Sequence, residues 1–221
     1  PAPKPVAPEP APAAPAPAPA PAPAPREENP ANRPLLQRIR VSAGVGPGFS
    51  MNADAVAPAG SKPIYFRGLL TGTLDLMKAG PGNLQIVVPV GLQGTHFSIS
   101  AFGFVVQGDV FGVDVMPSVR YRAEVFPEVA LFAELGLGFG NYSVTIQQQF
   151  VGYQTVSAGG IGVRLGAGAE YDLGGSLKLL LQPLELLTLS ATTTQTVNGM
   201  TVTSTSSASQ WALILGASYQ L

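Results

Sequence analysis

The chain lacks cysteine, has a single histidine, and is poor in charge. Only 11% of its 221 residues are Asp, Glu, Lys or Arg, against roughly 25% in ordinary soluble domains. Without cysteine there are no disulfides or thiolate metal sites, and we expect neither a metal nor a cofactor. A net charge of -1 gives no electrostatic basis for binding nucleic acid. The chain therefore has too few charges to coat a water-facing surface, and its mean hydropathy is +0.26.

Long apolar runs are also missing, because Gly, Thr or a charge interrupts each of them. The sequence therefore predicts no transmembrane helix. The opening Pro1-Ala2-Pro3 lacks the basic start and apolar core of a secretion signal, so we expect a processed or trimmed form.

An alternation of period two is what the chain has in abundance. Between residues 161 and 173 every odd position is apolar and every even position is Gly or charged. That period is typical of a strand with two different faces. Pro183 cannot donate to a strand ladder and is expected to shift the register around it. The pattern predicts eight strands, clear at 40–49, 84–93, 113–122, 131–140, 161–173 and 211–221 and weaker at 64–76 and 177–193.

The charged residues of these strands collect on the face opposite the apolar one. A closed eight-stranded barrel has an interior just wide enough to be filled by side chains, where unpaired charges would be costly. We expect an all-β, antiparallel, up-and-down transmembrane barrel whose apolar face meets lipid and whose lumen holds a balanced charge network without an open channel. The predicted network comprises Arg40, Arg67, Arg120, Arg122, Arg164, Lys178, Asp75, Asp114, Glu124, Glu134, Glu170 and Asp172.

Aromatic residues support the same orientation, because membrane barrels carry rings at both interfaces of the apolar band. Three tyrosines fall near one set of strand ends: Tyr121, Tyr171 and Tyr219. Five other rings fall toward the opposite ends: Phe49, Phe66, Phe111, Phe139 and Trp211.

Connection lengths are predicted to alternate. Short connections are expected near 77–83, 125–128 and 173–176, and longer loops near 50–62, 94–109, 147–155 and 194–209. In outer-membrane barrels the short turns and both termini lie in the periplasm. We expect the same arrangement here, with binding confined to the long loops.

Two Gly-rich strands carry a family resemblance: Leu135-Gly-Leu-Gly-Phe-Gly-Asn-Tyr142 and Gly160-Ile-Gly-Val-Arg-Leu-Gly-Ala-Gly-Ala-Glu-Tyr171. Over residues 36 to 221 the chain resembles the small eight-stranded outer-membrane β-barrels of the OmpA, OmpX and opacity-protein type. The family's last strand commonly ends in an aromatic residue, whereas this one ends Tyr219-Gln220-Leu221. The resemblance implies a Gram-negative outer membrane, with its lipid and lipopolysaccharide as partners, and an architecture rather than an activity.

Residues 1–34 belong to a different physical class from the barrel at 35–221. Alternating Pro and Ala from Pro10 to Pro25 favours extended polyproline II. At about 3.1 Å per residue this arm reaches on the order of 100 Å. It is either a solvated leader, or a tether through peptidoglycan or a docking strip for a periplasmic partner.

The function expected from these observations is non-enzymatic: envelope structure, tethering or surface interaction. The enzyme alternative is a lipid A or phospholipid hydrolase, since His96 and Ser98 share one strand face and Asp109 follows further along. Thr95-His96-Phe97-Ser98 resembles the His-x-Ser pair of outer-membrane lipid A deacylases. A narrow small-solute pore and a soluble lipocalin-like carrier are the remaining alternatives.

Overall fold

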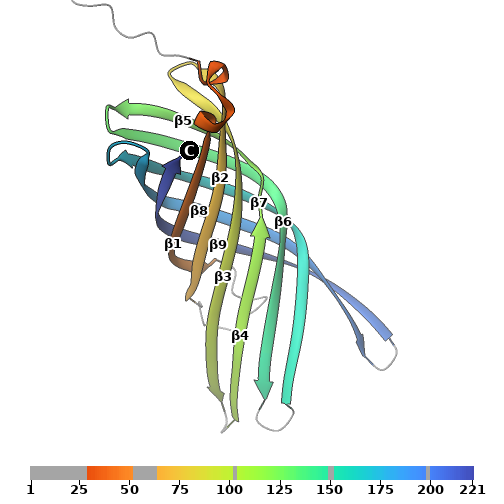
Figure 1. Ribbon diagram of the computed structural model, residues 1–221. Helices are drawn as coiled ribbons and strands as arrows, with labels where there is room; N and C mark the ends of the chain where they lie inside the picture. Colours follow the sequence, from red (N-terminus) through yellow and green to blue (C-terminus); the bar gives the residue numbers. More distant parts are fainter. Residues whose placement is uncertain (1–28, 52–63, 102–103, 149–151, 198–199) are drawn as a thin grey trace, which may run out of the picture.

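The protein is a closed antiparallel β-barrel (Figure 1), seen in a computed structural model that describes residues 29–51, 64–101, 104–148, 152–197 and 200–221. Two 3-10 turns precede the barrel, η1 (Pro30–Asn32) and η2 (Leu35–Arg38). The strands are β1 (Ile39–Ser50), β2 (Ile64–Ala79), β3 (Gly82–Ala101), β4 (Phe104–Val115), β5 (Ser118–Phe126), β6 (Val129–Gln148), β7 (Gly152–Asp172), β8 (Leu177–Val197) and β9 (Met200–Gln220).

Successive strands pair in an up-and-down order, and the first strand closes the sheet on the last. Val41 of β1 pairs with Tyr219 of β9, and all the strand pairs are antiparallel. No helix in the described part of the chain is long and apolar enough to cross a membrane. The predicted all-β up-and-down barrel is confirmed.

β4 and β5 form one strand of the wall, interrupted at Met116 and Pro117. The register against β3 runs through the break without an offset, from Val90↔Val115 to Val87↔Ser118. The interruption follows from Pro117 and from Pro89 opposite Met116, because neither proline has a backbone N–H to donate. Met116 N–H still donates to Pro89 O at 3.2 Å, and the Ser118 hydroxyl donates to Met116 O at 2.6 Å. The described residues therefore form a wall of the expected eight strands.

The apolar face of the strands points outward. Leu137 and Ile161 are 63% and 72% exposed, whereas Arg164, on the opposite face, is 0% exposed. A soluble barrel would show the reverse pattern, with charges outside and apolar side chains within. The apolar belt is consistent with lipid contact, as the sequence predicts.

A glycine of β1 lies where its neighbour strand leaves no room. A Cβ added at Gly46 would overlap the carbonyl oxygen of Leu213 in β9. We expect Gly46→Ala to lower the free energy of unfolding by about 1–3 kcal/mol, because the two strands must move apart. Urea unfolding in detergent micelles measures this change.

The matched control is Gly72→Ala in β2, where an added Cβ would meet nothing within 4 Å. It should leave the unfolding midpoint close to that of the unmodified chain. Equal effects of the two substitutions would contradict the close approach at Gly46.

Three of the predicted long loops are largely strand, which corrects the sequence prediction. Most of 94–109, 147–155 and 194–209 lies in β3, β4, β6, β7, β8 and β9, while 52–63 falls outside the described residues. The strands extend into these segments because cross-strand pairing continues there: Thr145 pairs with Thr155, and Thr192 with Thr205. Threonine is β-branched and favours strands, which fits the extension of β8 and β9 through the predicted loop at 194–209.

Beyond the barrel wall these hairpins separate. β3, β4, β6 and β7 extend together past β1 and β2, while the tip of the β8–β9 hairpin leaves them (Figure 1). The β7–β8 pairing stops at Gly159↔Thr192, whereas β8 and β9 stay paired to Val197↔Met200. We call the end of the barrel from which these hairpins extend the hairpin end. The opposite end, which carries residues 29–38 and Leu221, we call the terminal mouth.

Candidate functional site

The lumen holds a continuous ion network that begins at Arg67 in β2. Arg67 Nη1 contacts Asp114 Oδ2 at 2.7 Å, and Arg67 Nη2 contacts Glu185 Oε1 at 2.7 Å. All three side chains are buried. Each therefore depends on its partners to replace the hydration that it loses.

The network continues toward the terminal mouth through Arg164 and Arg120. Arg164 contacts Glu185 at 3.1 Å and Glu134 at 2.6 Å. Arg120 contacts Glu134 at 2.8 Å, and its guanidinium lies 4.1 Å from the centre of the Phe132 ring. Arg164 of β7 thus joins carboxylates on its two neighbouring strands, β6 and β8, and Arg120 of β5 contacts a carboxylate on its neighbour β6.

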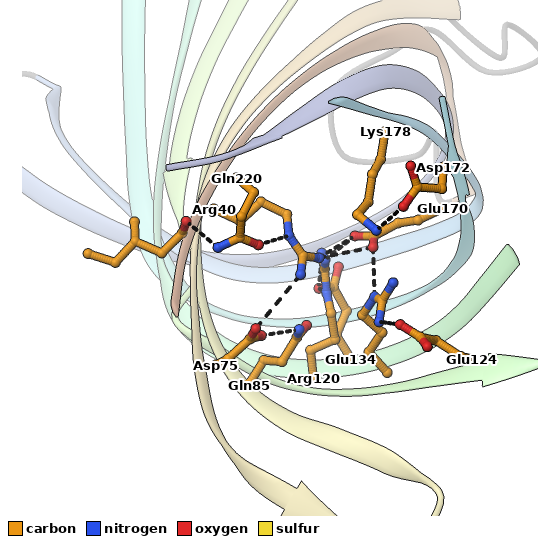
Figure 2. Close-up of polar contacts among 12 residues, drawn as sticks. Arg40, Asp75, Gln85, Arg120, Glu124, Glu134, Glu170, Asp172, Lys178 and Gln220 are labelled. Atoms are coloured by element: carbon orange, nitrogen blue, oxygen red, sulfur yellow. Dashed lines mark hydrogen bonds and ion pairs between the residues drawn. The ribbon is translucent and has the colours of Figure 1, made fainter. Parts of the chain in front are cut away.

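At the mouth the network converges on Glu170 (Figure 2). Glu170 Oε2 accepts from Arg40 at 2.9 Å and from Arg122 at 2.8 Å, and Arg120 lies 3.6 Å from Oε1. Arg122 also donates to Glu124 at 2.9 Å. Among the described residues, the buried members are five arginines and five carboxylates: Arg40, Arg67, Arg120, Arg122, Arg164, Asp75, Asp114, Glu134, Glu170 and Glu185. Their charges balance.

The structure places three of the predicted network residues at the rim instead of the buried lumen. The Glu124 side chain is 62% exposed although it pairs with Arg122. Lys178 Nζ donates to Asp172 Oδ2 at 2.8 Å, and both side chains are partly exposed. The Lys178 ammonium, together with the Gly174 N–H, lowers the pKa of Asp172 below its ordinary value.

Glu185 is the central member that the sequence pattern missed. The β8 register shifts between Gln182 and Glu185, so that Gln182 and Glu185 both face inward while Pro183 and Leu184 lie between them on the exposed side. Strict alternation from Gln182 would have pointed Glu185 outward. The only signal was Pro183, at which the sequence predicted a shift of register.

A small apolar cluster shares the lumen with the network. Met116, Leu187 and Leu189 are buried together, and Tyr142 packs against them. The lumen is thus filled by paired charges and by this apolar cluster.

The predicted interface aromatics lie on the outward side of the wall. Phe66, Phe111, Phe139, Tyr121, Tyr171 and Tyr219 are exposed, and Phe49 and Trp211 are partly exposed. Phe49 and Trp211 stack with their ring centres 5.2 Å apart. The Tyr171 hydroxyl donates to Glu128 at 3.3 Å, as expected of a ring at a polar boundary.

A polar cavity of about 260 Å³ opens at the terminal mouth. The N-terminal segment lies against it: Pro30 is buried and lines the cavity, and the Lys78 N–H donates to Asn29 Oδ1 at 3.2 Å. Residues 29–34, which the sequence assigned to the linker, therefore contact the barrel. Residues 1–28 of the predicted arm lie outside the described residues.

The candidate hydrolase residues lie on the exposed surface of the β3–β4 hairpin. His96 Nδ1 is 2.8 Å from Asp109 Oδ1, and their side chains are 61% and 72% exposed. Ser98 is exposed on the same strand and pairs across the ladder with Gln107, and no contact between His96 and Ser98 is found among the described residues. Across all the residues that the structure describes, no group of His, Asp and Glu side chains is placed to hold a metal.

Comparisons with known proteins find similarity in fold alone. No protein-family model matches the sequence, and no curated protein matches it. Among solved structures, a major outer membrane protein from Thermus thermophilus is 17% identical with a TM-score of 0.48, covering 82% of this chain and 98% of that one. The attachment invasion locus protein Ail of Yersinia pestis, solved with a heparin analogue, is 14% identical with a TM-score of 0.44, covering 82% and 98%.

The outer membrane protease OmpT of Escherichia coli is 9% identical with a TM-score of 0.48, covering 83% of this chain and 79% of that one. The chain is thus similar to small outer-membrane β-barrel proteins. Its assignment as a barrel rests on the pairing of its own strands and on the outward direction of its apolar face.

Proposed function

We propose that the chain is a non-enzymatic outer-membrane barrel that serves envelope structure, tethering or surface interaction. The observation that carries the proposal is the inversion of its two faces. Leucine, isoleucine and phenylalanine side chains cover the outside, whereas ten charged side chains of balanced sign are buried inside. A closed barrel of this kind suits the outer membrane, because every strand has two neighbours and no sheet edge meets lipid.

The filled lumen supports an anchoring role over a pore. Arg67 of β2 crosses the lumen to carboxylates on β4 and β8. Arg164 joins carboxylates on its neighbours β6 and β8, and the cluster of Met116, Leu187 and Leu189 fills further space in the lumen. Transport of a solute would require these contacts to break together. Among the residues that the structure describes, the exposed His96–Asp109 pair makes no hydrogen bond with a serine hydroxyl, so a hydrolase has less support.

The two ends of the barrel suit different partners. The terminal mouth leads into the Pro/Ala-rich residues, which would reach a periplasmic or peptidoglycan-associated partner. The hairpin end presents uncharged hydroxyl pairs, with Thr145 3.1 Å from Thr155 and Thr192 3.4 Å from Thr205. These hairpins would contact the lipopolysaccharide layer or an extracellular surface.

The test is refolding of the full chain into lipid vesicles or detergent. We expect a strand-rich circular dichroism spectrum and a band whose gel mobility changes on heating, because the closed barrel resists unfolding until it is heated. A monodisperse monomer obtained without detergent would contradict the membrane assignment. Discrete openings in planar bilayers would favour a pore instead.

A further inference from the structure

We infer that a shallow apolar groove on the outer face of the wall is a binding site for the acyl chain of a membrane lipid. The groove lies where β3, β5 and β6 meet, beside the interruption at Pro117, and it holds about 500 Å³. That volume is within the range of ligand sites, roughly 300–1,000 Å³. The inference rests on the proposed membrane location and deepens it, because it assigns one lipid contact to one place on the apolar belt.

The groove follows from the break in the wall. Pro117 faces outward with a compact ring, and Gly136 beside it in β6 has no side chain. Leu137 N–H donates to Pro117 O at 3.1 Å, so β6 stays attached across the interruption. Larger aliphatic side chains stand around this low point, all of them at least 41% exposed: Ile86, Val119, Leu135 and Leu137.

One end of the groove is a row of side chains across three strands. Ile86 of β3 pairs with Val119 of β5, and Val119 pairs with Leu135 of β6. A ligand in the groove therefore contacts side chains from three strands at once, whereas a flat part of the belt offers it one layer of contacts.

The lining has no hydrogen-bonding group to offer a polar ligand. None of the described lining residues is charged, and Ser118 is the one among them with a polar side chain. Ser118 is buried, and its hydroxyl already donates to Met116 O at 2.6 Å. A sugar, a headgroup or a peptide would lose hydrogen bonds there without replacing them. The ligand is therefore a hydrocarbon.

The depth of the groove identifies that hydrocarbon. Phe139 lies just beyond Leu137 on β6, and Tyr171 pairs with Val129 at the start of the same strand. The groove thus lies between two of the outward rings that mark the edges of the apolar belt. The hydrocarbon core of a bilayer lies at that depth, and the groove is continuous with the lipid-facing wall. A lipid acyl chain reaches it without leaving the hydrocarbon.

Packing, and not transfer out of water, distinguishes the groove from the rest of the belt. A lipid tail is as apolar as leucine, so moving along the wall brings no hydrophobic gain. Each additional pair of atoms in contact adds a small dispersion attraction, and many such pairs add up. We therefore expect an acyl chain to occupy the groove more often than it occupies a flat part of the wall.

The experiment refolds the full chain into vesicles of dimyristoyl phosphatidylcholine that contain a trace of phosphatidylcholine with a diazirine midway along one acyl chain. Irradiation releases nitrogen, and the carbene that remains inserts into the nearest side chains. Mass spectrometry of the digested chain then locates the label. The reference position is Leu70, an outward leucine of β2 that is 56% exposed, as Leu135 is.

Two matched variants accompany the unmodified chain. Val119→Phe fills the groove from its own lining. Val45→Phe makes the same change on the outward face of β1, outside the groove, where Val45 is 54% exposed against 53% for Val119. Both substitutions place an apolar ring on the lipid-facing side, so neither should prevent the barrel from forming.

In the unmodified chain we expect the label at Leu135 and Leu137 to exceed the label at Leu70 roughly threefold. Val119→Phe should remove that excess, and Val45→Phe should leave the label at Leu135 and Leu137 unchanged. Equal labelling of the groove and of Leu70 would overturn the inference, since ordinary lipid contact would explain it. Loss of the excess as the protein-to-lipid ratio rises would also overturn it, because a second copy of the chain would then cover the groove.

Gel mobility of the same samples separates this result from the proposed function. A heat-modifiable barrel that is labelled evenly refutes the acyl-chain site alone. A chain that forms no heat-modifiable barrel refutes the membrane assignment on which the site rests.

Discussion

Replacing Glu185 by glutamine is expected to lower the free energy of unfolding by about 3–5 kcal/mol. Glu185 accepts from Arg67 at 2.9 and 2.7 Å and from Arg164 at 3.1 Å. All three side chains are buried, so neutralising the carboxylate leaves excess positive charge in the lumen without water to hydrate it. Urea unfolding in lipid vesicles, followed by the fluorescence of Trp211, measures the change.

Glu124→Gln is the matched control for Glu185→Gln. It removes the same charge from the same network, but at a position whose side chain is 62% exposed and hydrated. We expect a loss of at most about 1 kcal/mol there. Similar small losses for both variants would show that the buried contacts do not hold the wall together.

Replacing Leu135 by arginine is expected to destabilise the lipid-inserted barrel by about 2–4 kcal/mol. Leu135 lies on the outward face of β6 between Leu131 and Phe139, and it is exposed. In a bilayer its position falls in the middle of the apolar belt, where a guanidinium loses its hydration. Refolding equilibria in vesicles, with the folded fraction resolved by gel mobility, provide the measurement.

The depth dependence of the arginine penalty distinguishes lipid contact from any other cause. Leu177 is also outward and exposed, but it pairs with Tyr219 at the tyrosine end of the belt. Leu177→Arg should cost only about 0–1 kcal/mol, because the side chain reaches the interface. If Leu135→Arg were neutral or stabilising, the apolar face would not be in lipid.

The direction of the two faces could be predicted from sequence because it depends on short-range alternation. Leu165 and Arg164 are neighbours, and once a strand is assumed they must point to opposite sides. The scarcity of charge then decides which side meets water. The opposite directions of neighbouring side chains follow from the local period, and the choice of the water-facing side follows from composition. Both can be read from any strand of the sequence without knowing its partners.

The partners of the lumenal charges could not be predicted in the same way. Arg67 and Glu185 are 118 residues apart, and Arg40 and Glu170 are 130 apart. Their contacts depend on barrel closure and on the register of several strands together. One shift near Pro183 was enough to hide Glu185, although the proline itself marked the place.

The hairpin end should tolerate more evolutionary sequence variation than the barrel wall. Past Thr192 and Thr205 the β8–β9 ladder pairs only with itself among the described residues. Changes of length or composition there leave the wall hydrogen bonds and the ion network intact. Natural variants are therefore expected to diversify fastest in these hairpins, while the lumen changes only by paired, compensating substitutions.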